Sequence, residues 1–273
     1  MNHRDLSSPT LDGLIKRLQL RLNAHATAAT REWWTKYLRG AASFRGVKME
    51  DVRKAVHAWF EEEQLGEHFS VGQQKVLVLM LLEEIYSEDK LAGVLFLQEI
   101  LLPAGALDWH SELPRFARLF DEGYISDWST CDWFCVKVLG PLAEQQGEAC
   151  ARAISEWREA QSVWQRRASV VSFANLAHKG DQNFPGFTEM VLDNCSDLLG
   201  SRERFAQTGV GWVLRELSRS DQDRVVGFVE ANLGRFSREA LKNATKYLPP
   251  EVKERLLQAH LPSGSRGRRR NLR

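Results

Sequence analysis

The spacing of apolar residues is the feature that most constrains the fold of this chain. Apolar side chains recur every three or four residues over most of its length, which is the period of an amphipathic α-helix. Residues that favour strands are scarce, with five Ile, eight Thr and four Tyr among 273 residues. We therefore predict an all-α fold. The predicted helices span residues 10–25, 27–39, 49–64, 70–86, 88–102, 111–122, 127–145, 147–159, 162–178, 185–198, 202–219, 221–232, 235–247 and 250–260.

Short links join the predicted helices, and Gly or Pro stands at most of their boundaries, for example at Gly40, Pro103 and Gly147. Helices of about 11 to 18 residues with short links pack as antiparallel pairs. From Phe69 onward a pair recurs about every 35–40 residues, the spacing of HEAT-like or armadillo-like α-solenoids. We therefore expect a HEAT-like α-solenoid of stacked antiparallel helix pairs, whose concave face suits an elongated partner. A four-helix bundle with extra helices is the alternative.

The sequence contains no segment that we expect to enter a membrane. Its longest apolar run, Val76–Leu82, has seven residues, whereas a membrane-spanning helix needs about 18. The first ten residues lack the apolar core of a signal peptide, so we expect a cytoplasmic protein. We also expect one domain over residues 1–261, followed by a disordered basic tail rich in Gly, Ser and Arg over residues 262–273.

Neither the cysteines nor the histidines form a pattern typical of a metal site. The four cysteines include no Cys-x-x-Cys pair, and the seven histidines are scattered. The sequence has no Gly-rich phosphate loop, no His-Glu-x-x-His, no Gly-x-Ser-x-Gly and no dinucleotide fingerprint. We expect buried, reduced thiols, and neither a metal ion nor a cofactor.

The net charge of +1 conceals an uneven distribution of charged residues. Residues 14–48 carry a net charge of +7, residues 61–122 carry −9 and residues 201–250 carry +3. The tail from Pro262 adds five Arg and no acid. This asymmetry favours a polyanionic partner that one part of the surface binds, although charges that only solvate helix faces would give the same distribution.

The helix predicted around Asp132 contains the clearest candidate for chemistry. Its sequence, DWSTCDWFCVKVLGPLA over residues 127–143, is almost wholly apolar around this carboxylate. Helical spacing puts Trp128, Asp132 and Val136 on one face. A carboxylate there is costly to desolvate unless it is paired or used. Asp132 is therefore either a catalytic group or a core residue that binds a backbone amide or an Arg on a neighbouring helix.

Two further segments combine aromatic residues with cations. The run VWQRRA over residues 163–168 contains two arginines, and the run GVGWVLRE over residues 209–216 places two glycines before Trp212. Glycines there would let another group approach the backbone closely beside the indole. Taken singly, each Trp of the chain is explained by core packing.

These motifs resemble those of the AlkD-like DNA glycosylases, the HEAT-like DNA alkylation repair family. The resemblance covers residues 10–250, and its most specific parts are the Trp-Asp helix and the Gly-Trp-Val-Leu-Arg-Glu run. The motifs that match in order and separation are W-x-x-x-D at 128–132, WQRRA at 164–168, GWVLRE at 211–216, WTKYLR at 34–39 with FRGV at 44–47, and LGRFSREA at 233–240.

The resemblance implies a role for each matching residue. Asp132 matches the family's catalytic carboxylate, and Arg167 matches an arginine that contacts the DNA backbone beside the lesion. The residues expected to contact the lesion are Trp128, Trp212 and Tyr37. The residues expected to bind the DNA backbone are Arg167, Arg166, Arg215, Arg238 and Lys242.

The family hydrolyses the N-glycosidic bond of cationic N3- or N7-alkylated purines in duplex DNA without a metal or cofactor. The resemblance therefore implies a DNA repair glycosylase with a concave DNA-binding face, and we expect a monomer, associated with the nucleoid if it is bacterial. A fixed carboxylate suits this reaction because it stabilises the oxocarbenium-like charge that develops on the sugar. The alternative is a non-catalytic HEAT-like scaffold that binds branched DNA or a protein partner. Asp132 together with Trp128 and Trp212 favours the enzyme.

Overall fold

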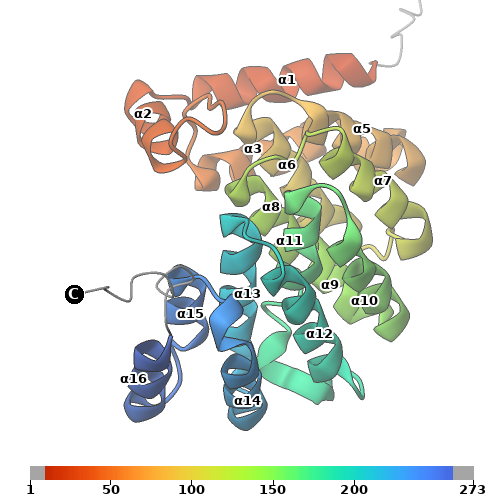
Figure 1. Cartoon of the computed structure of the whole chain (residues 1–273). Helices are drawn as coiled ribbons and strands as arrows, with labels where there is room; N and C mark the ends of the chain where they lie inside the picture. Colours follow the sequence, from red (N-terminus) through yellow and green to blue (C-terminus); the bar gives the residue numbers. More distant parts are fainter. Residues whose placement is uncertain (1–9, 261–273) are drawn as a thin grey trace, which may run out of the picture. The chain divides into compact units, whose positions relative to one another are not determined.

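A computed structural model describes residues 10–260 and shows a helical protein (Figure 1). Within this range the chain forms sixteen α-helices and no strand, and one isolated parallel β-bridge joins Ser43 to Tyr86. The prediction of an all-α fold is confirmed. No helix in residues 10–260 combines the length and the apolar character that crossing a membrane requires. The predicted tail, residues 262–273, lies outside the described residues.

The contacts among the helices divide the chain into two compact units, Met1–Leu107 and Asp108–Arg273. The single domain expected over residues 1–261 stays a prediction. In the first unit α3 packs on α1 and α6, and α5 packs on α6. The helical segments of this unit are α1 (Leu11–Ala24), α2 (Ala28–Tyr37), α3 (Met49–Glu62), α4 (Leu65–His68), α5 (Val71–Glu83), α6 (Ser87–Phe96) and the π-helical turn η1 (Leu97–Leu101).

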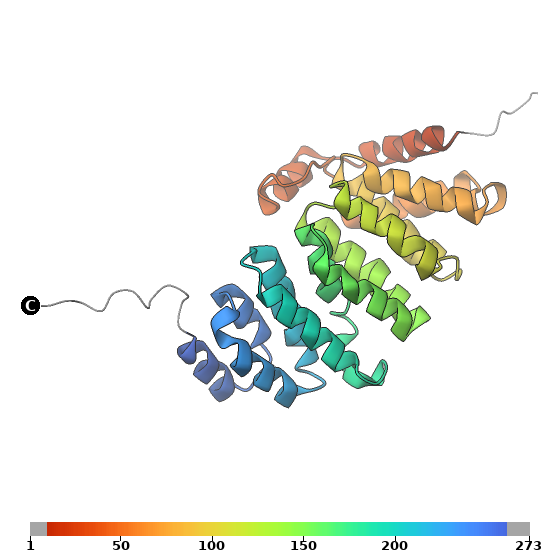
Figure 2. The ribbon, with the colours of Figure 1, turned by 45° about the vertical axis from the view of Figure 1, so that its right-hand side comes forward.

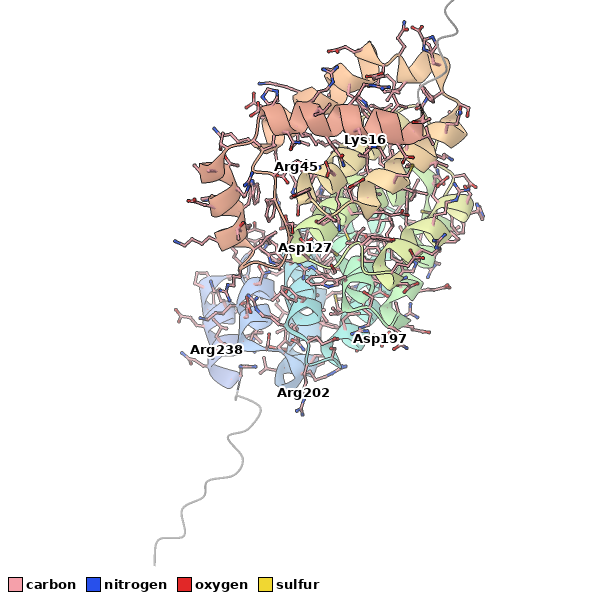
Figure 3. All side chains as sticks on the ribbon, turned by 90° about the horizontal axis from the view of Figure 1, so that it is seen from above. Lys16, Arg45, Asp127, Asp197, Arg202 and Arg238 are labelled. Atoms are coloured by element: carbon pink, nitrogen blue, oxygen red, sulfur yellow. The ribbon has the colours of Figure 1, made fainter. Side chains whose placement is uncertain are left out.

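Two acidic residues at the start of α6 fasten the loop between α2 and α3. The Glu88 carboxylate accepts hydrogen bonds from the backbone N–H groups of residues 45–47, at 2.9, 2.8 and 3.0 Å. Arg45 is labelled in Figure 3. Its guanidinium pairs with Asp89 at 2.7 Å and donates to Asn23 Oδ1 in α1 at 2.8 Å. Glu88 and Asp89 are buried. Because these buried polar groups are hydrogen-bonded, the loop has one defined position in the unit.

The second unit contains two layers of helices (Figures 1 and 2). One layer runs through α8, α11, α13 and α15, and the other runs through α10, α12 and α14, with each helix packed on the next. Helix α12 also packs on α11 and α13 and so joins the layers. The helical segments are α7 (Trp109–Asp121), α8 (Trp128–Phe134), η2 (Cys135–Leu139), α9 (Gly140–Gln146), α10 (Glu148–Ser155), η3 (Glu156–Glu159), α11 (Val163–Val171), η4 (Ala177–Gln182), α12 (Phe187–Leu199), α13 (Arg204–Leu217), α14 (Gln222–Asn232), η5 (Leu233–Arg235), α15 (Arg238–Ala244) and α16 (Pro250–Ala259).

The two glycines before Trp212 allow neighbouring helices to approach α13. A Cβ atom on Gly211 would lie 2.6 Å from the carbonyl oxygen of Ala240 in α15. A Cβ atom on Gly209 would lie 3.3 Å from Arg167 Nη1 and from Val170 Cγ2, both in α11. The groups that these glycines admit are therefore the helices on either side of α13.

The helix predicted over residues 127–145 is interrupted by the π-helical turn η2. The Gly140 N–H donates to the carbonyl of Cys135, five residues earlier. Pro141 follows directly, and a proline within a helix lacks the N–H and clashes with the carbonyl four residues before it. The wider turn accommodates this proline. The turn η1 has the same arrangement, with Pro103 two residues after its last residue.

Other stretches also differ from the predicted helices. The helix predicted over residues 162–178 ends at Val171. Beyond it the chain forms turns, in which the Asn183 side chain donates to the carbonyls of Leu176 and Gly180 at 3.0 and 2.8 Å. These side-chain hydrogen bonds satisfy backbone groups that have left the helix. The four-residue helix α4 lies in a stretch that was predicted as a link.

Candidate functional site

The side chain of Asp127 fixes the start of α8, the helix that contains Asp132. Asp127, which Figure 3 labels, is buried, and its carboxylate accepts a hydrogen bond from the Thr130 N–H at 2.9 Å. This N-cap makes Trp128 the first residue of the helix. Asp132 follows one turn later on the same side of α8. Its side chain is 16% exposed, so the carboxylate lies at the edge of the core.

One arginine holds both carboxylate oxygens of Asp132. Arg167 in α11 donates from Nε to Oδ1 at 2.7 Å and from Nη2 to Oδ2 at 2.9 Å, which is a bidentate ion pair. Its Nη1 group donates to the carbonyl of Phe205 at 2.7 Å and to the Thr208 hydroxyl at 3.1 Å, both in α13. Arg167 therefore links α8, α11 and α13. This ion pair is the contact with an Arg of a neighbouring helix that a structural role for Asp132 predicts, so the pair alone is compatible with both roles considered for Asp132.

Burial raises the pKa of Asp132, because loss of water disfavours the charged carboxylate. The positive charge and the hydrogen bonds of Arg167 act in the opposite direction. Desolvation works to lower the pKa of Arg167, but the charge and hydrogen bonds of Asp132, with smaller contributions from Cys131 and Cys135, together outweigh it and raise that pKa. Burial also raises the pKa of the adjacent Cys131 thiol. The site is therefore a desolvated ion pair beside a neutral thiol.

Both tryptophans that are predicted to contact the lesion lie on helices that contribute to the Asp132–Arg167 site. Trp128 precedes Asp132 by four residues in α8 and shares its face. Trp212 follows Thr208 by four residues in α13, and Thr208 is hydrogen-bonded to Arg167. Both indoles are half-buried. The structure thus places the two indoles on the helix faces that hold the ion pair.

Tyr37, the third residue predicted to contact the lesion, belongs to the first unit. It is the last residue of α2 and is 49% exposed. Its ring stacks on that of Trp33, with the centroids 5.2 Å apart and the planes 12° from parallel. Its contact with the lesion stays a prediction.

The other residues predicted to bind the DNA backbone have different surroundings. Arg166 is half-buried and pairs with Glu203. Arg215 pairs with Glu216 at 2.6 Å. The two predicted residues that lie in α15, Arg238 and Lys242, are exposed, and Figure 3 labels Arg238.

Sequence reasoning missed the groups that complete the Arg167 site. A backbone carbonyl such as that of Phe205 leaves no signal in a sequence. Thr208 did leave a signal in the sequence, because it lies four residues before Trp212 and therefore faces the same side of the helix. Within residues 10–260, no three His, Cys, Asp or Glu side chains are grouped as a metal site would need.

Comparison with known proteins identifies a family and a solved structure that this chain resembles. The sequence profile of a family described as DNA alkylation repair enzyme matches residues 18–248. The structure is similar to that of a predicted DNA alkylation repair enzyme from Enterococcus faecalis, with a TM-score of 0.67 and 16% sequence identity over 83% of this chain and 98% of that chain. No curated protein matches the sequence. The structural match shows a shared fold, and the profile match shows that this chain belongs to the DNA alkylation repair enzyme family.

Proposed function

We propose that this protein is a DNA glycosylase that hydrolyses the N-glycosidic bond of cationic N3- or N7-alkylated purines in double-stranded DNA. The observation that most supports this proposal is the Asp132 carboxylate at the edge of the core, desolvated and oriented by Arg167 between helices that carry Trp128 and Trp212.

The reaction needs little acid catalysis, because the alkylated purine already carries a positive charge. When the bond between C1′ and the purine nitrogen breaks, its electron pair moves to the purine, which leaves as a neutral base. Positive charge develops on the sugar, and a fixed carboxylate lowers the energy of that charge. Water then adds to C1′ and loses a proton. Each Asp132 oxygen accepts one hydrogen bond from Arg167 and keeps lone-pair capacity with which to orient this water.

Arg167 acts in this proposal first as a positioning residue. Four of its hydrogen bonds are made inside the protein, two to Asp132 and two to α13. They fix the carboxylate before substrate binds, which is the condition for electrostatic stabilisation without reorganisation. A contact with the DNA phosphate would use the remaining N–H of Nη2.

The aromatic and basic residues supply binding. The faces of Trp128 and Trp212 attract the positive charge of the lesion and its sugar, and Tyr37 is proposed to contact the lesion from α2. Phosphates are bound by the exposed cations Arg238 and Lys242, and Arg166 and Arg215 are further candidate phosphate contacts. We propose that one copy of the chain performs the reaction, with water as the only co-reactant.

The competing function is a non-catalytic helical scaffold, in which the Asp132–Arg167 pair only joins helices. The deciding assay incubates the protein with duplex DNA that contains N7-methylguanine and measures released base and abasic sites. We expect single-turnover excision by the native protein, and a loss of about 10²–10³-fold in Asp132→Asn. Release no faster than the spontaneous rate would favour the scaffold.

A second variant separates catalysis from stability, because Asp132→Asn also leaves Arg167 without its charged partner. The double variant Asp132→Asn with Arg167→Gln replaces the ion pair by two neutral amides that can still hydrogen-bond. We expect it to regain thermal stability relative to Asp132→Asn and to remain inactive. If excision returned together with stability, Asp132 would have no part in the chemistry.

A further inference from the structure

Helix α2 in the first unit presents aromatic side chains to solvent. None of its ten residues is buried. Trp33 is 57% exposed although one face of its ring is stacked on Tyr37. These two side chains, four residues apart on one face of the helix, form the Trp33–Tyr37 stack. An exposed aromatic pair on a helix with no buried residue is costly in water, and it is a candidate binding surface.

The Trp33–Tyr37 stack is held in place although its helix has no buried residue. The neighbouring Trp34 ring stacks on the buried Phe44, with centroids 5.6 Å apart and planes 11° from parallel. Arg31 Nε donates to the carbonyl of Arg45 at 3.0 Å, in the loop that Glu88 fastens to α6. The conformational entropy of fixing the stack is therefore already lost in the folded protein, which favours binding through it.

The charges around the stack select the kind of partner. Residues 28–48 contain four exposed cations, Arg31, Lys36, Arg39 and Lys48, against one acid, Glu32. A stacked aromatic surface among cations matches a polymer that combines flat rings with a regular negative charge. Single-stranded nucleic acid has this combination, since its bases stack on aromatic side chains and its phosphates attract Lys and Arg. Bases inside a duplex are stacked on their neighbours, so their faces are not available to an aromatic side chain.

We propose that the Trp33–Tyr37 stack binds unpaired bases of DNA, as a second contact besides the site around Asp132. It goes beyond the proposed function and rests on it in taking DNA as the polymer and in sharing Tyr37, which the proposed function also assigns to the lesion. One base extends the stack on the exposed part of the Trp33 ring, and Lys36 and Arg39 attract the phosphates on either side.

The test measures fluorescence anisotropy of a labelled 12-nucleotide single strand and of an undamaged 20-base-pair duplex. Trp33→Ala is expected to weaken single-strand binding by about five- to a hundredfold, the range for loss of one stacked base, and to change duplex binding less than about twofold. Trp33→Phe keeps a ring and should retain most of the single-strand affinity. The matched control is Ile85→Ala, which removes another strongly exposed apolar side chain from the same unit and should leave both affinities unchanged.

Three results would overturn this inference. The first is an unchanged single-strand affinity in Trp33→Ala, and the second is an equal loss on single strand and duplex. The third is binding of the native protein to vesicles of anionic phospholipid that Trp33→Ala abolishes while single-strand affinity is retained, which would assign the stack to a membrane surface. Because the assay uses undamaged DNA, it is independent of base release. A failed glycosylase assay and a failed stacking assay can therefore be told apart.

Discussion

Replacing Arg167 by Gln tests whether this residue holds Asp132 or only contacts DNA. The Asp132 and Arg167 side chains are 16% and 6% exposed, so the variant leaves a desolvated carboxylate without its charged partner. Breaking a buried ion pair in this way costs about 3–5 kcal/mol. At about 2–4 °C per kcal/mol for a domain of this size, we expect the Tm to fall by about 6–20 °C. An arginine that only met phosphates would leave the Tm unchanged.

The pH dependence of this loss identifies its cause. Burial raises the pKa of Asp132 and Arg167 opposes that rise, so the pKa rises further in the variant. A carboxyl group whose pKa is raised by folding destabilises the protein above that pKa and no longer does so once it is protonated. The difference in Tm between the variant and the native protein should therefore be largest at neutral pH. It should shrink as the pH falls from 7 towards about 4, the usual range of an Asp.

The chain provides a matched control for this experiment. Arg204 makes the same bidentate contact with Glu239, at 2.8 and 2.7 Å, but the two side chains are 57% and 52% exposed. Arg204→Gln should cost no more than about 1 kcal/mol, because water replaces the lost partner. Differential scanning calorimetry of both variants from pH 4 to 7 decides the question. Equal losses in the two variants, or a loss in Arg167→Gln that does not vary with pH, would refute the reasoning.

Further predictions concern packing and DNA binding. Gly211→Ala should destabilise the protein by about 1–3 kcal/mol, because the added Cβ meets the backbone of α15. Gly227→Ala in α14, where the added Cβ meets open space, should stabilise the protein by about 0.5–1 kcal/mol. Equal Tm values for the two variants would contradict the close approach of α13 to α15. Lys242→Gln should reduce the slope of log affinity against log salt by about one for intact duplex, the change for one phosphate contact, as measured by anisotropy titrations. Deleting residues 262–273 should leave single-turnover excision unchanged. At low salt it should weaken binding to damaged and to undamaged duplex by the same factor. A loss of affinity confined to damaged DNA would contradict this prediction.

The sequence was sufficient for most of the helices because most have an apolar stripe and many have a Gly or Pro near one end. It was insufficient for η1 and η2, because a π turn inserts one residue into a helix without changing the apolar character of the segment. It was insufficient for the end of α11 as well. There the apolar run continues to Leu176, although the helix ends at Val171. The turns beyond it are held by Asn183, which donates to the Leu176 carbonyl seven positions earlier.

The candidate site could be predicted from the sequence only in part, for a similar reason. Asp132 stood out because a lone carboxylate in an apolar helix must be paired or used. Its partner Arg167 lies 35 residues away, and no periodicity links the two. Their contact depends on the packing of α8 against α11, which the sequence pattern does not encode. The direction in which each face of α13 points depends likewise on packing, because Gly209 lies against α11 and Gly211 lies against α15.

The π turn η2 also affects how this chain is aligned with its relatives. A π turn holds one more residue than the α turn it replaces, so the direction of every later side chain is rotated by about 100° relative to a continuous α-helix. Residues up to Phe134 can be matched by counting from Asp132, whereas residues from Gly140 onward can be matched only after a one-residue gap against a relative without this turn. An alignment without that gap would pair core positions of α9 with surface positions and would make a family likeness look weaker than it is.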